Sequence, residues 1–487
     1  MQKIISGEEV KVLDASHVAL TGQSSYDLME NAANEFVDWI KKQDLQKKSY
    51  LVAVGKGNNG GDGLAIARML HKEGYSVSVL RCFGSNEKIS PDAHANLKLL
   101  PEAIHCYTIE DNFPMAGILI DAFLGVGLQG ELREDAAHVI KRLNEFTGYK
   151  ISVDIPSGLP SDSLTNGAVV NADITVSFEF PKLSLLMPEH SAYVGELVVL
   201  KIGIEDSAYH PFNSDTYFLT ARDIPAFHRK FNRFSHKGDF GKILLAGGSP
   251  GKMGALILCA KSALRTGSGL VSCHMEETEH HIMQTAVPEA MATWGLIPYA
   301  EYYDALGIGP GWGQENRVSL MRHLLHDFKK PLVIDADGLN LLAKNKELLS
   351  LIPKKSILTP HIGEFTRLVG DCDNHLERLE KAKKFAIDNG VILILKGANS
   401  AVCFPDGRQI FNSSGTQFMA TGGSGDVLTG MLTSFLGMGY SPEHAALCGV
   451  YHHGLAGEIA AQKKRRGVIA SDIIDAIPET YIQLNIE

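Results

Sequence analysis

Long apolar segments are missing from this sequence. No run approaches the roughly 18 apolar residues that a membrane-spanning helix needs. Residues 1–10 also lack the apolar core that a secretory signal carries. We therefore expect a cytoplasmic protein without a membrane partner.

Paired cysteines and an excess of positive charge are missing as well. The seven cysteines are scattered with no C-x-x-C pair, which is typical of buried thiols in a reducing compartment rather than of disulfides or a zinc site. Lys and Arg number 46 against 56 Asp and Glu, so the net charge is −10 at pH 7. Binding of nucleic acid needs a basic surface, and we therefore expect no nucleic-acid partner.

Apolar strands alternate with amphipathic helices along most of the chain. At 487 residues the chain is too long for one hydrophobic core, so more than one domain is expected. The first helix is expected to begin at the capping box of residues 24–27. Strands are expected at residues 50–54, 77–80, 118–121, 151–154, 242–246, 332–335, 357–359 and 391–395. This alternation predicts α/β domains with parallel sheets covered on both faces.

The alternation fails between residues 204 and 229, where Pro211 and Pro225 stand among polar residues without a sustained period. We interpret this stretch as a connection between domains. The sequence thus predicts an N-terminal domain at residues 1–212, a linker at 213–225 and a C-terminal domain at 226–487. No internal repeat relates the two domains.

The sharpest motif of the N-terminal half is GKGNNGGDG at residues 55–63, directly after a predicted strand. It fits the G-x-G-x-x-G pattern and opens a helix, expected from Asp62, so that backbone amides could hold a pyrophosphate. Dinucleotide-binding sheets usually carry an acidic residue at the end of the next strand, where Arg81 stands instead. A tight turn with Asp62 as the helix cap is the alternative.

Two further strand ends carry polar residues that should reach the same edge of the sheet. The motif DAFLGVG begins at Asp121, and VDIPSG contains Asp154 and Ser157. Ligands of such sheets lie beyond the carboxyl ends of the strands. Asn59, Asp121 and Ser157 could together bind a monovalent cation through oxygen atoms, and Asp154 is a candidate general acid and base.

These three motifs, in this order after the helix segment LMENA at residues 28–32, resemble those of the NAD(P)H-hydrate epimerases. The resemblance implies a Rossmann-like three-layer α/β/α domain and a potassium ion held by Asn59, Asp121 and Ser157. It also implies that Asp154 is catalytic and contacts the substrate. The other substrate-binding residues that it implies are Asn58, Asn59, Gly60, Gly61, Asp62, Gly125, Val126, Gly127, Leu128, Gln129, Gly130 and Glu131.

The strongest motif of the C-terminal half is ATGGSGDVL at residues 420–428, which leads into an apolar helix. The amides at such a helix start form an anion site. Asp426 is placed to take the proton from a hydroxyl that attacks a phosphoryl group, and a helix-cap aspartate is the alternative. The segment resembles the G-x-G-D signature of ribokinase-like kinases. A P-loop is excluded because Met253 follows Gly251-Lys252 where Ser or Thr is required.

Further motifs of this half are KGANS at residues 396–400, TPHIGE at 359–364, GPG at 309–311, Gly254-Ala255 and DAD at 335–337. Together they resemble the ADP-dependent NAD(P)H-hydrate dehydratases, which implies a ribokinase-like α/β/α domain. By this resemblance the hydrate contacts Ala255, Gly311, His361 and the catalytic Asp426. The ADP-binding residues that it implies are Lys396, Gly397, Ala398, Asn399, Ser400 and Gly425.

The combined resemblance implies repair of hydrated NADH and NADPH. One domain would interconvert the R and S epimers of the hydrate. The other would dehydrate the S epimer with ADP and Mg²⁺, the latter held in part by Glu364, and would release AMP and phosphate. It also implies a homo-oligomer. The alternatives are a ribokinase-like kinase of a vitamin precursor fused to a nucleotide-binding sensor domain, and a purely structural role for His361.

Overall fold

The computed structural model describes residues 1–43, 45, 48–84, 87–128, 130, 132–297 and 300–486. The chain divides into two compact units. The N-terminal unit is Lys3–Ser214, and the C-terminal unit contains Met1–Gln2 and Asp215–Glu487. Within the described ranges, no helix has both the length and the apolar character to cross a membrane.

The N-terminal unit is built on a parallel sheet of order β4-β3-β2-β5-β6-β7-β8. Its strands are β2 (Tyr50–Val54), β3 (Val77–Arg81), β4 (His105–Thr108), β5 (Ile118–Ala122), β6 (Tyr149–Val153), β7 (Ile174–Phe178) and β8 (Glu196–Leu200). Because all strands point the same way, their carboxyl ends meet at one edge. The segments that follow β2, β5 and β6 are the three motifs of the N-terminal half.

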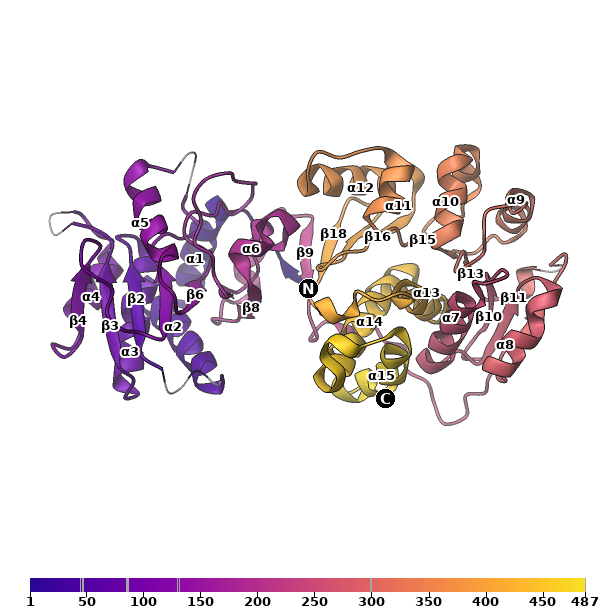
Figure 1. Ribbon diagram of the computed structural model, residues 1–487, viewed down its shortest axis with the longest axis horizontal. Coiled ribbons are helices and arrows are strands. Elements are labelled where there is room, and N and C mark those ends of the chain that lie inside the picture. The colour runs from indigo at the N-terminus through magenta and orange to yellow at the C-terminus, as the bar shows by residue number, and fades with distance from the viewer. Residues whose placement is uncertain are drawn as a thin grey trace. The chain divides into compact units, whose positions relative to one another are not determined.

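Helices cover both faces of this sheet (Figure 1). The helices α2 (Ser25–Lys42), α3 (Asn58–Lys72) and α4 (Pro91–Lys98) pack on the face that bears Val52 and Val54. Helix α5 (Glu134–Asn144) packs on the opposite face, which bears Leu51. Successive side chains of a strand point to opposite faces, so one buried strand supplies two cores. The short helix α6 (Ser191–Val194) precedes β8.

A helix that the sequence pattern did not reveal begins the N-terminal unit. Helix α1 (Gly7–Thr21) is capped by Ser6, whose backbone N–H donates to Glu9 Oε2 at 2.9 Å. Only Gly7, Leu13 and His17 of this helix are buried, so it lacks the broad apolar stripe by which helices are predicted. The prediction that the first helix starts near residue 24 was therefore wrong, although α2 does begin there.

The C-terminal unit has a mixed sheet of order β1-β9-β18-β17-β16-β15-β14-β13-β10-β11-β12. Its strands are β1 (Gln2–Lys3), β9 (Thr216–Leu219), β10 (Lys242–Ala246), β11 (Leu270–His274), β12 (Met291–Thr293), β13 (Ala305–Ile308), β14 (Val333–Ile334), β15 (Ile357–Leu358), β16 (Ile392–Leu395), β17 (Ala401–Cys403) and β18 (Gln409–Asn412). Strand pairs from β12 to β16 are parallel, and β17 is antiparallel to both of its neighbours. Strand β9 lies inside the range that the sequence predicted as a linker.

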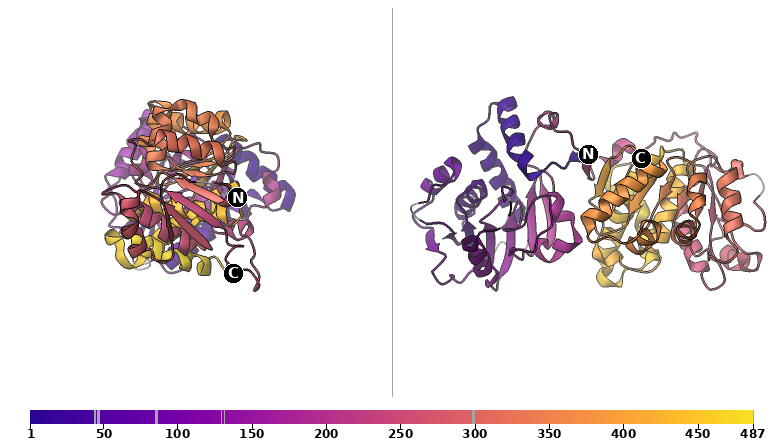
Figure 2. Two further views of the ribbon diagram at one scale, coloured as in Figure 1. Left: turned by 90° about the vertical axis from the view of Figure 1, so that its right-hand side faces the viewer. Right: turned by 90° about the horizontal axis from the view of Figure 1, so that it is seen from above.

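This sheet is also covered by helices on both faces, as Figure 2 shows with the orange helices above the strands and the yellow helices below them. Helices on one face are α7 (Met253–Thr266), α8 (His280–Ala286), α13 (Ser424–Gly437), α14 (Pro442–Lys464) and α15 (Ala470–Gln483). Helices on the other are α9 (Val318–Asp327), α10 (Ala336–Lys344), α11 (Ile362–Val369) and α12 (His375–Asn389). The predicted α/β/α architecture of both units is confirmed.

Candidate active sites

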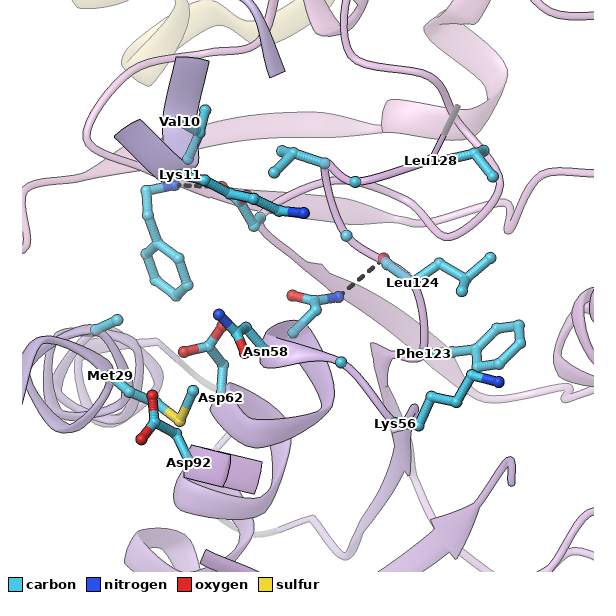
Figure 3. A pocket seen from close by; sticks show the side chains of 18 of the residues that line it. Val10, Lys11, Met29, Lys56, Asn58, Asp62, Asp92, Phe123, Leu124 and Leu128 are labelled. Atoms are coloured by element: carbon cyan, nitrogen blue, oxygen red, sulfur yellow. Dashed lines mark hydrogen bonds between the residues drawn. The ribbon is translucent and has the colours of Figure 1, made fainter. Parts of the chain in front are cut away.

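A cavity of about 1630 Å³ lies at the carboxyl edge of the N-terminal sheet. It is lined by the segments that follow β2 to β7 and by α1 and α2. Figure 3 shows Asn58 and Asp62 side by side on the first turns of α3, with Lys11 extending from α1 above them. The cavity is larger than the roughly 300–1,000 Å³ of ordinary small-molecule sites, so a dinucleotide fits its scale.

The glycine loop after β2 is shorter than the sequence predicted. Helix α3 begins at Asn58 with Gly57 as its cap residue, so the predicted start at Asp62 was wrong and Asp62 is not a cap. A Cβ atom on Gly60 would lie 1.9 Å from the carbonyl oxygen of Gly55. Only glycine permits this close approach, which brings the first turn of α3 back against the end of β2.

Asp154 follows β6 and forms an ion pair with Lys182, whose side chain is only 2% exposed. The carboxylate atom Oδ1 accepts a hydrogen bond from the Phe178 backbone N–H at 3.0 Å as well as from the Lys182 ammonium. Lys182 also donates to Ser177 Oγ at 3.2 Å. Within the described ranges these contacts all converge on Oδ1, which leaves Oδ2 available for proton transfer.

Two further carboxyl groups line the cavity near this pair. The pKa of Asp14 is raised to about 6, chiefly by burial; the charge of Asp154 contributes to this shift and Lys182 opposes it. Burial likewise raises the pKa of Asp62 well above its usual value, again with Asp154 adding to the effect. Asp14 and Asp62 are therefore crowded by a third carboxylate near one ammonium, an arrangement that favours the protonated form of a buried carboxyl group.

Sequence reasoning found neither Asp14 nor Lys182. Asp14 stands on α1, the helix without an apolar stripe. Lys182 lies 28 residues from Asp154 along the chain, and its only signal was a single cation inside the apolar segment FPKLSLLMP.

The predicted potassium ligands lie together behind the glycine loop. Asp121 accepts hydrogen bonds from Ser157 Oγ at 2.5 Å and from the Ser157 backbone N–H at 2.9 Å. Asn59 donates through Nδ2 to the Leu124 carbonyl at 2.9 Å, the dashed line at Leu124 in Figure 3. The Leu124 backbone N–H in turn donates to Ser157 Oγ at 2.8 Å.

Asp121 is fully buried, and burial raises its pKa although Ser157 and Ser152 donate to it. No cationic side chain in the described ranges pairs with it. A set of carboxylate, amide, hydroxyl and carbonyl oxygens around an uncompensated buried carboxylate suits a hard cation. These residues therefore fit a potassium ion.

The remaining predicted epimerase residues divide into two groups. Gly125, Val126, Gly127 and Leu128 line the cavity together with Asn58, Asn59 and Asp62. Gly60, Gly61 and Gly130 are not among its lining residues. A Cβ on Gly61 would meet Met29 at 2.6 Å, so this glycine serves the packing of α3 against α2. Gln129 and Glu131 lie outside the described residues.

In the C-terminal unit a buried carboxylate joins three elements. Asp335 stands between the end of β14 and the start of α10 and is 1% exposed. Its Oδ1 accepts from the Lys396 ammonium at 2.8 Å, and its Oδ2 accepts from Thr429 Oγ1 on α13 at 2.7 Å. Lys396 also lies 3.8 Å from Glu364. Burial lowers the pKa of Lys396, but Asp335 and Glu364 outweigh this effect and hold it above its usual value.

Asp426 stands in the first turn of α13, three residues after the cap residue Gly423. It is therefore not a helix cap. Burial raises its pKa to about 7, with Asp335 adding to the shift and Lys396 opposing it. A Cβ on Gly425 would lie 3.2 Å from the Lys396 ammonium. The structure thus brings Gly425, Asp426 and Lys396 into one cluster.

His361 caps helix α11 with its ring. Its Nδ1 accepts from the Gly363 backbone N–H at 3.0 Å, and its backbone N–H donates to Glu364 Oε2 at 2.9 Å. Nδ1 of His361 therefore has the structural role that the sequence left open, because it caps the helix. The side chain is 54% exposed, and its Nε2 lies 3.5 Å from Glu364 Oε1.

The other predicted residues of this unit lie in the segments that follow β10, β13 and β16, with Ala255 in the first turn of α7. A Cβ on Gly311 would lie 3.0 Å from that of Ala255, so these two residues are neighbours. Residues 397–400 form the turn between β16 and β17, in which the Gly397 N–H donates to Ser400 Oγ at 3.4 Å.

The C-terminal cluster can accommodate magnesium. In the described part of the chain, no group of three or more His, Cys, Asp or Glu side chains forms a ready metal site. Mg²⁺ in phosphoryl-transfer sites commonly binds one or two carboxylates together with phosphate oxygens. Asp335 and Glu364 surround a single ammonium group, so the donor set and its charge fit such an ion.

The fold and the two sites define a class: an enzyme that joins a dinucleotide-binding α/β unit to a ribokinase-like α/β unit. A family model described as NAD(P)H-hydrate dehydratase matches residues 243–479. A second model, described as YjeF-related protein N-terminus, matches residues 25–184.

The chain is 36% identical to the bifunctional NAD(P)H-hydrate repair enzyme of Moorella thermoacetica, over 94% of this chain and 92% of that protein. It is 33% identical to the enzyme of the same name from Escherichia coli, over 94% of this chain and 89% of that protein. The chain therefore belongs to the bifunctional NAD(P)H-hydrate repair enzymes. The family resemblance seen in the sequence is confirmed.

Solved structures resemble the C-terminal unit. The ADP/ATP-dependent NAD(P)H-hydrate dehydratase of Bacillus subtilis, co-crystallized with ATP/Mg²⁺, matches with a TM-score of 0.50 and 30% identity, over 55% of this chain and 98% of that one. A ribokinase-like superfamily protein of Enterococcus faecalis matches with a TM-score of 0.52 and 25% identity, over 56% and 98%.

Proposed function

We propose that this chain repairs hydrated NADH and NADPH with two active sites. The N-terminal unit interconverts the R and S epimers of NAD(P)H hydrate. The C-terminal unit dehydrates the S epimer with ADP and releases NAD(P)H, AMP and phosphate. The observation that supports this function best is that each sheet has a carboxyl group placed for proton transfer at its carboxyl edge. This group is Asp154 in the N-terminal unit and Asp426 in the C-terminal unit.

The epimerase reaction needs a group that both gives and takes a proton. In the hydrate, a hydroxyl stands on a ring carbon next to nitrogen, and the nitrogen lone pair expels it as water once the oxygen receives a proton. Water then adds to either face of the iminium and loses a proton. Asp154 performs both transfers through Oδ2, because Lys182 holds Oδ1. Asp14 and Asp62 keep a proton within the site.

The dehydratase reaction converts a poor leaving group into a good one. Asp426 takes the proton of the hydrate hydroxyl while the hydroxyl oxygen attacks the β-phosphorus of ADP, and AMP departs. The ring nitrogen then expels phosphate while the neighbouring carbon loses a proton, which restores the dihydropyridine. Lys396 and the amides at the start of α13 bind the phosphates.

Two cations complete the proposal. Asn59, Asp121 and Ser157 hold potassium, which supplies positive charge behind the glycine loop. Glu364, with Asp335 beside it, holds magnesium, which when bound offsets charge on the phosphoryl group. His361, Ala255 and Gly311 contact the hydrate, and residues 396–400 with Gly425 bind ADP.

The epimerase domain predicted at residues 1–212 and the dehydratase domain predicted at residues 226–487 correspond in this proposal to the two compact units, with a connection between them. Because β9 pairs with β18 of the C-terminal sheet, the connecting segment is shorter than 213–225. We further propose a cytoplasmic location and a homo-oligomer.

The products separate this function from that of a vitamin-precursor kinase, which would accumulate a phosphorylated compound. We would incubate the full chain with purified S hydrate and either ADP or ATP, and follow the near-ultraviolet absorbance of the dihydropyridine together with the nucleotide products. Regained absorbance with equal amounts of AMP and phosphate is expected with ADP. No regained absorbance with either nucleotide would contradict the dehydratase assignment.

A further inference from the structure

The N-terminal cavity extends across several adjacent strands. Asp154 follows β6, and the order β3-β2-β5-β6 places Arg81 at the end of a strand three positions away. Neighbouring strands lie about 4.8 Å apart, so these two strand ends are separated by roughly 14 Å. Both residues line the cavity. A single ring cannot fill this length, so the part near Arg81 must take the far end of the substrate.

Arg81 is the last residue of β3 and pairs in register with Val54, directly before the glycine loop. Its Nε atom is buried and has no hydrogen-bond partner. In the described ranges no carboxylate forms an ion pair with this guanidinium. By contrast, the neighbouring cavity cation Lys56 is neutralised by Glu87 at 2.7 Å. A buried guanidinium atom without a partner indicates a missing acceptor.

The position of Arg81 determines which acceptor fits. In dinucleotide-binding sheets, the residue at the end of the strand next to the glycine-loop strand reaches the adenosine ribose. An acidic residue there binds the 2′-hydroxyl, whereas an arginine accommodates a 2′-phosphate. The planar guanidinium matches phosphate with two parallel hydrogen bonds.

We propose that Arg81 binds the 2′-phosphate of the substrate, so that the epimerase site favours NADPH hydrate over NADH hydrate. This rests on the proposed epimerase function. The reacting ring is the same in both substrates, and the discrimination arises at the opposite end of the cavity.

The test compares kcat/KM for epimerisation of NADPH hydrate and NADH hydrate by the full chain without ADP, so that the dehydratase is idle. Wild type should prefer NADPH hydrate. In Arg81→Gln the ratio of the two kcat/KM values should fall about tenfold or more, since a charge-assisted contact is lost. Arg81→Lys should keep part of the preference. Arg81→Glu should reverse it, because the acidic side chain repels the phosphate and accepts from a 2′-hydroxyl.

Arg142→Gln is the matched control, because Arg142 lies on α5 outside the cavity lining and pairs with Glu145. A second readout is inhibition of epimerisation by adenosine 2′,5′-bisphosphate and by AMP. The bisphosphate should inhibit wild type more strongly than AMP, and Arg81→Gln should abolish the difference.

The outcomes separate this inference from the function on which it rests. If wild type epimerises neither hydrate, the proposed function fails. If wild type epimerises the hydrates but Arg81→Gln leaves the ratio unchanged or lowers both values equally, only the role of Arg81 is overturned.

Discussion

Lys182 and Asp154 form a buried ion pair in which the carboxylate residue has left-handed backbone, with a φ of 67°. Among residues with a side chain, Asn and Asp tolerate this conformation best. Asp154→Asn is therefore a cleaner test of proton transfer than Asp154→Ala, which adds backbone strain to the loss of the carboxylate.

The pair also bears on stability. Lys182→Met leaves a buried carboxylate without its cation, which should lower the free energy of unfolding of the N-terminal unit by about 3 kcal/mol. Lys182→Met combined with Asp154→Asn removes both charges and should recover much of the loss. Hydrogen exchange of the β6 and β7 amides measures the effect. Equal protection in Lys182→Met and in the double variant would show that the unpaired carboxylate does not destabilise the unit.

The dehydratase should depend on pH through Asp426. Burial raises the pKa of this carboxyl from 3.8 to about 7, so below pH 7 it is largely protonated and cannot accept the hydroxyl proton. We therefore expect kcat/KM for dehydration of the S epimer to rise with pH around a midpoint near 7 and to level off about one pH unit above it.

Asp335→Asn tests the cause of that shift. Asp335 raises the pKa of Asp426 and also binds Lys396, so its loss removes a repelling charge and leaves a cation unpaired. Both changes should move the midpoint to lower pH. A midpoint that stays in place, or moves upward, would be inconsistent with Asp426 as the titrating base.

The glycine loop offers a matched pair of substitutions. Gly60→Ala places a Cβ 1.9 Å from the Gly55 carbonyl oxygen. It should lower the free energy of unfolding by about 1–3 kcal/mol and should also lower the rate of epimerisation. Gly57→Ala meets nothing within 4 Å at a φ of −90°, so it should lose only the difference between glycine and alanine at a helix N-cap, about 1 kcal/mol or less. Denaturant unfolding measures both changes. Equal stability of the two variants would contradict the close approach of Gly60 to Gly55.

Epimerisation should require a cation at Asp121. This carboxylate is fully buried, and its charge is costly without a counter-ion. Replacing potassium by choline at equal ionic strength should slow conversion of pure R hydrate about tenfold or more. Dehydration of pure S hydrate, measured in the same solutions, controls for effects on the C-terminal unit. An unchanged epimerisation rate would show that the reaction does not depend on potassium.

Much of the fold was predictable because buried parallel strands are continuous apolar runs. The strands predicted at residues 50–54 and 242–246 have these bounds in the structure as β2 and β10. Strand β9 was missed because its four residues stand in a polar stretch between two prolines. Helix α1 was missed because it buries few residues, and Asp14 was missed with it.

The sites were predictable only where a motif follows a strand. The residues that bind Asp335 lie 61 and 94 positions away in sequence, and no local pattern signals such contacts. The same holds for Lys182 and Asp154. These pairs form through the order of strands in a sheet, which the linear sequence does not display.

The two-site account is tested most directly by adding ADP to a mixture of R and S hydrates and following each epimer by chromatography. The wild-type chain and the control Asp38→Asn, whose side chain is 58% exposed on α2, should consume both epimers. Asp154→Asn should consume the S epimer and leave the R epimer to spontaneous interconversion. Asp426→Asn should consume neither, yet should equilibrate pure R hydrate at the wild-type rate. Consumption of both epimers by Asp154→Asn at the wild-type rate, or survival of dehydration in Asp426→Asn, would contradict the assignment.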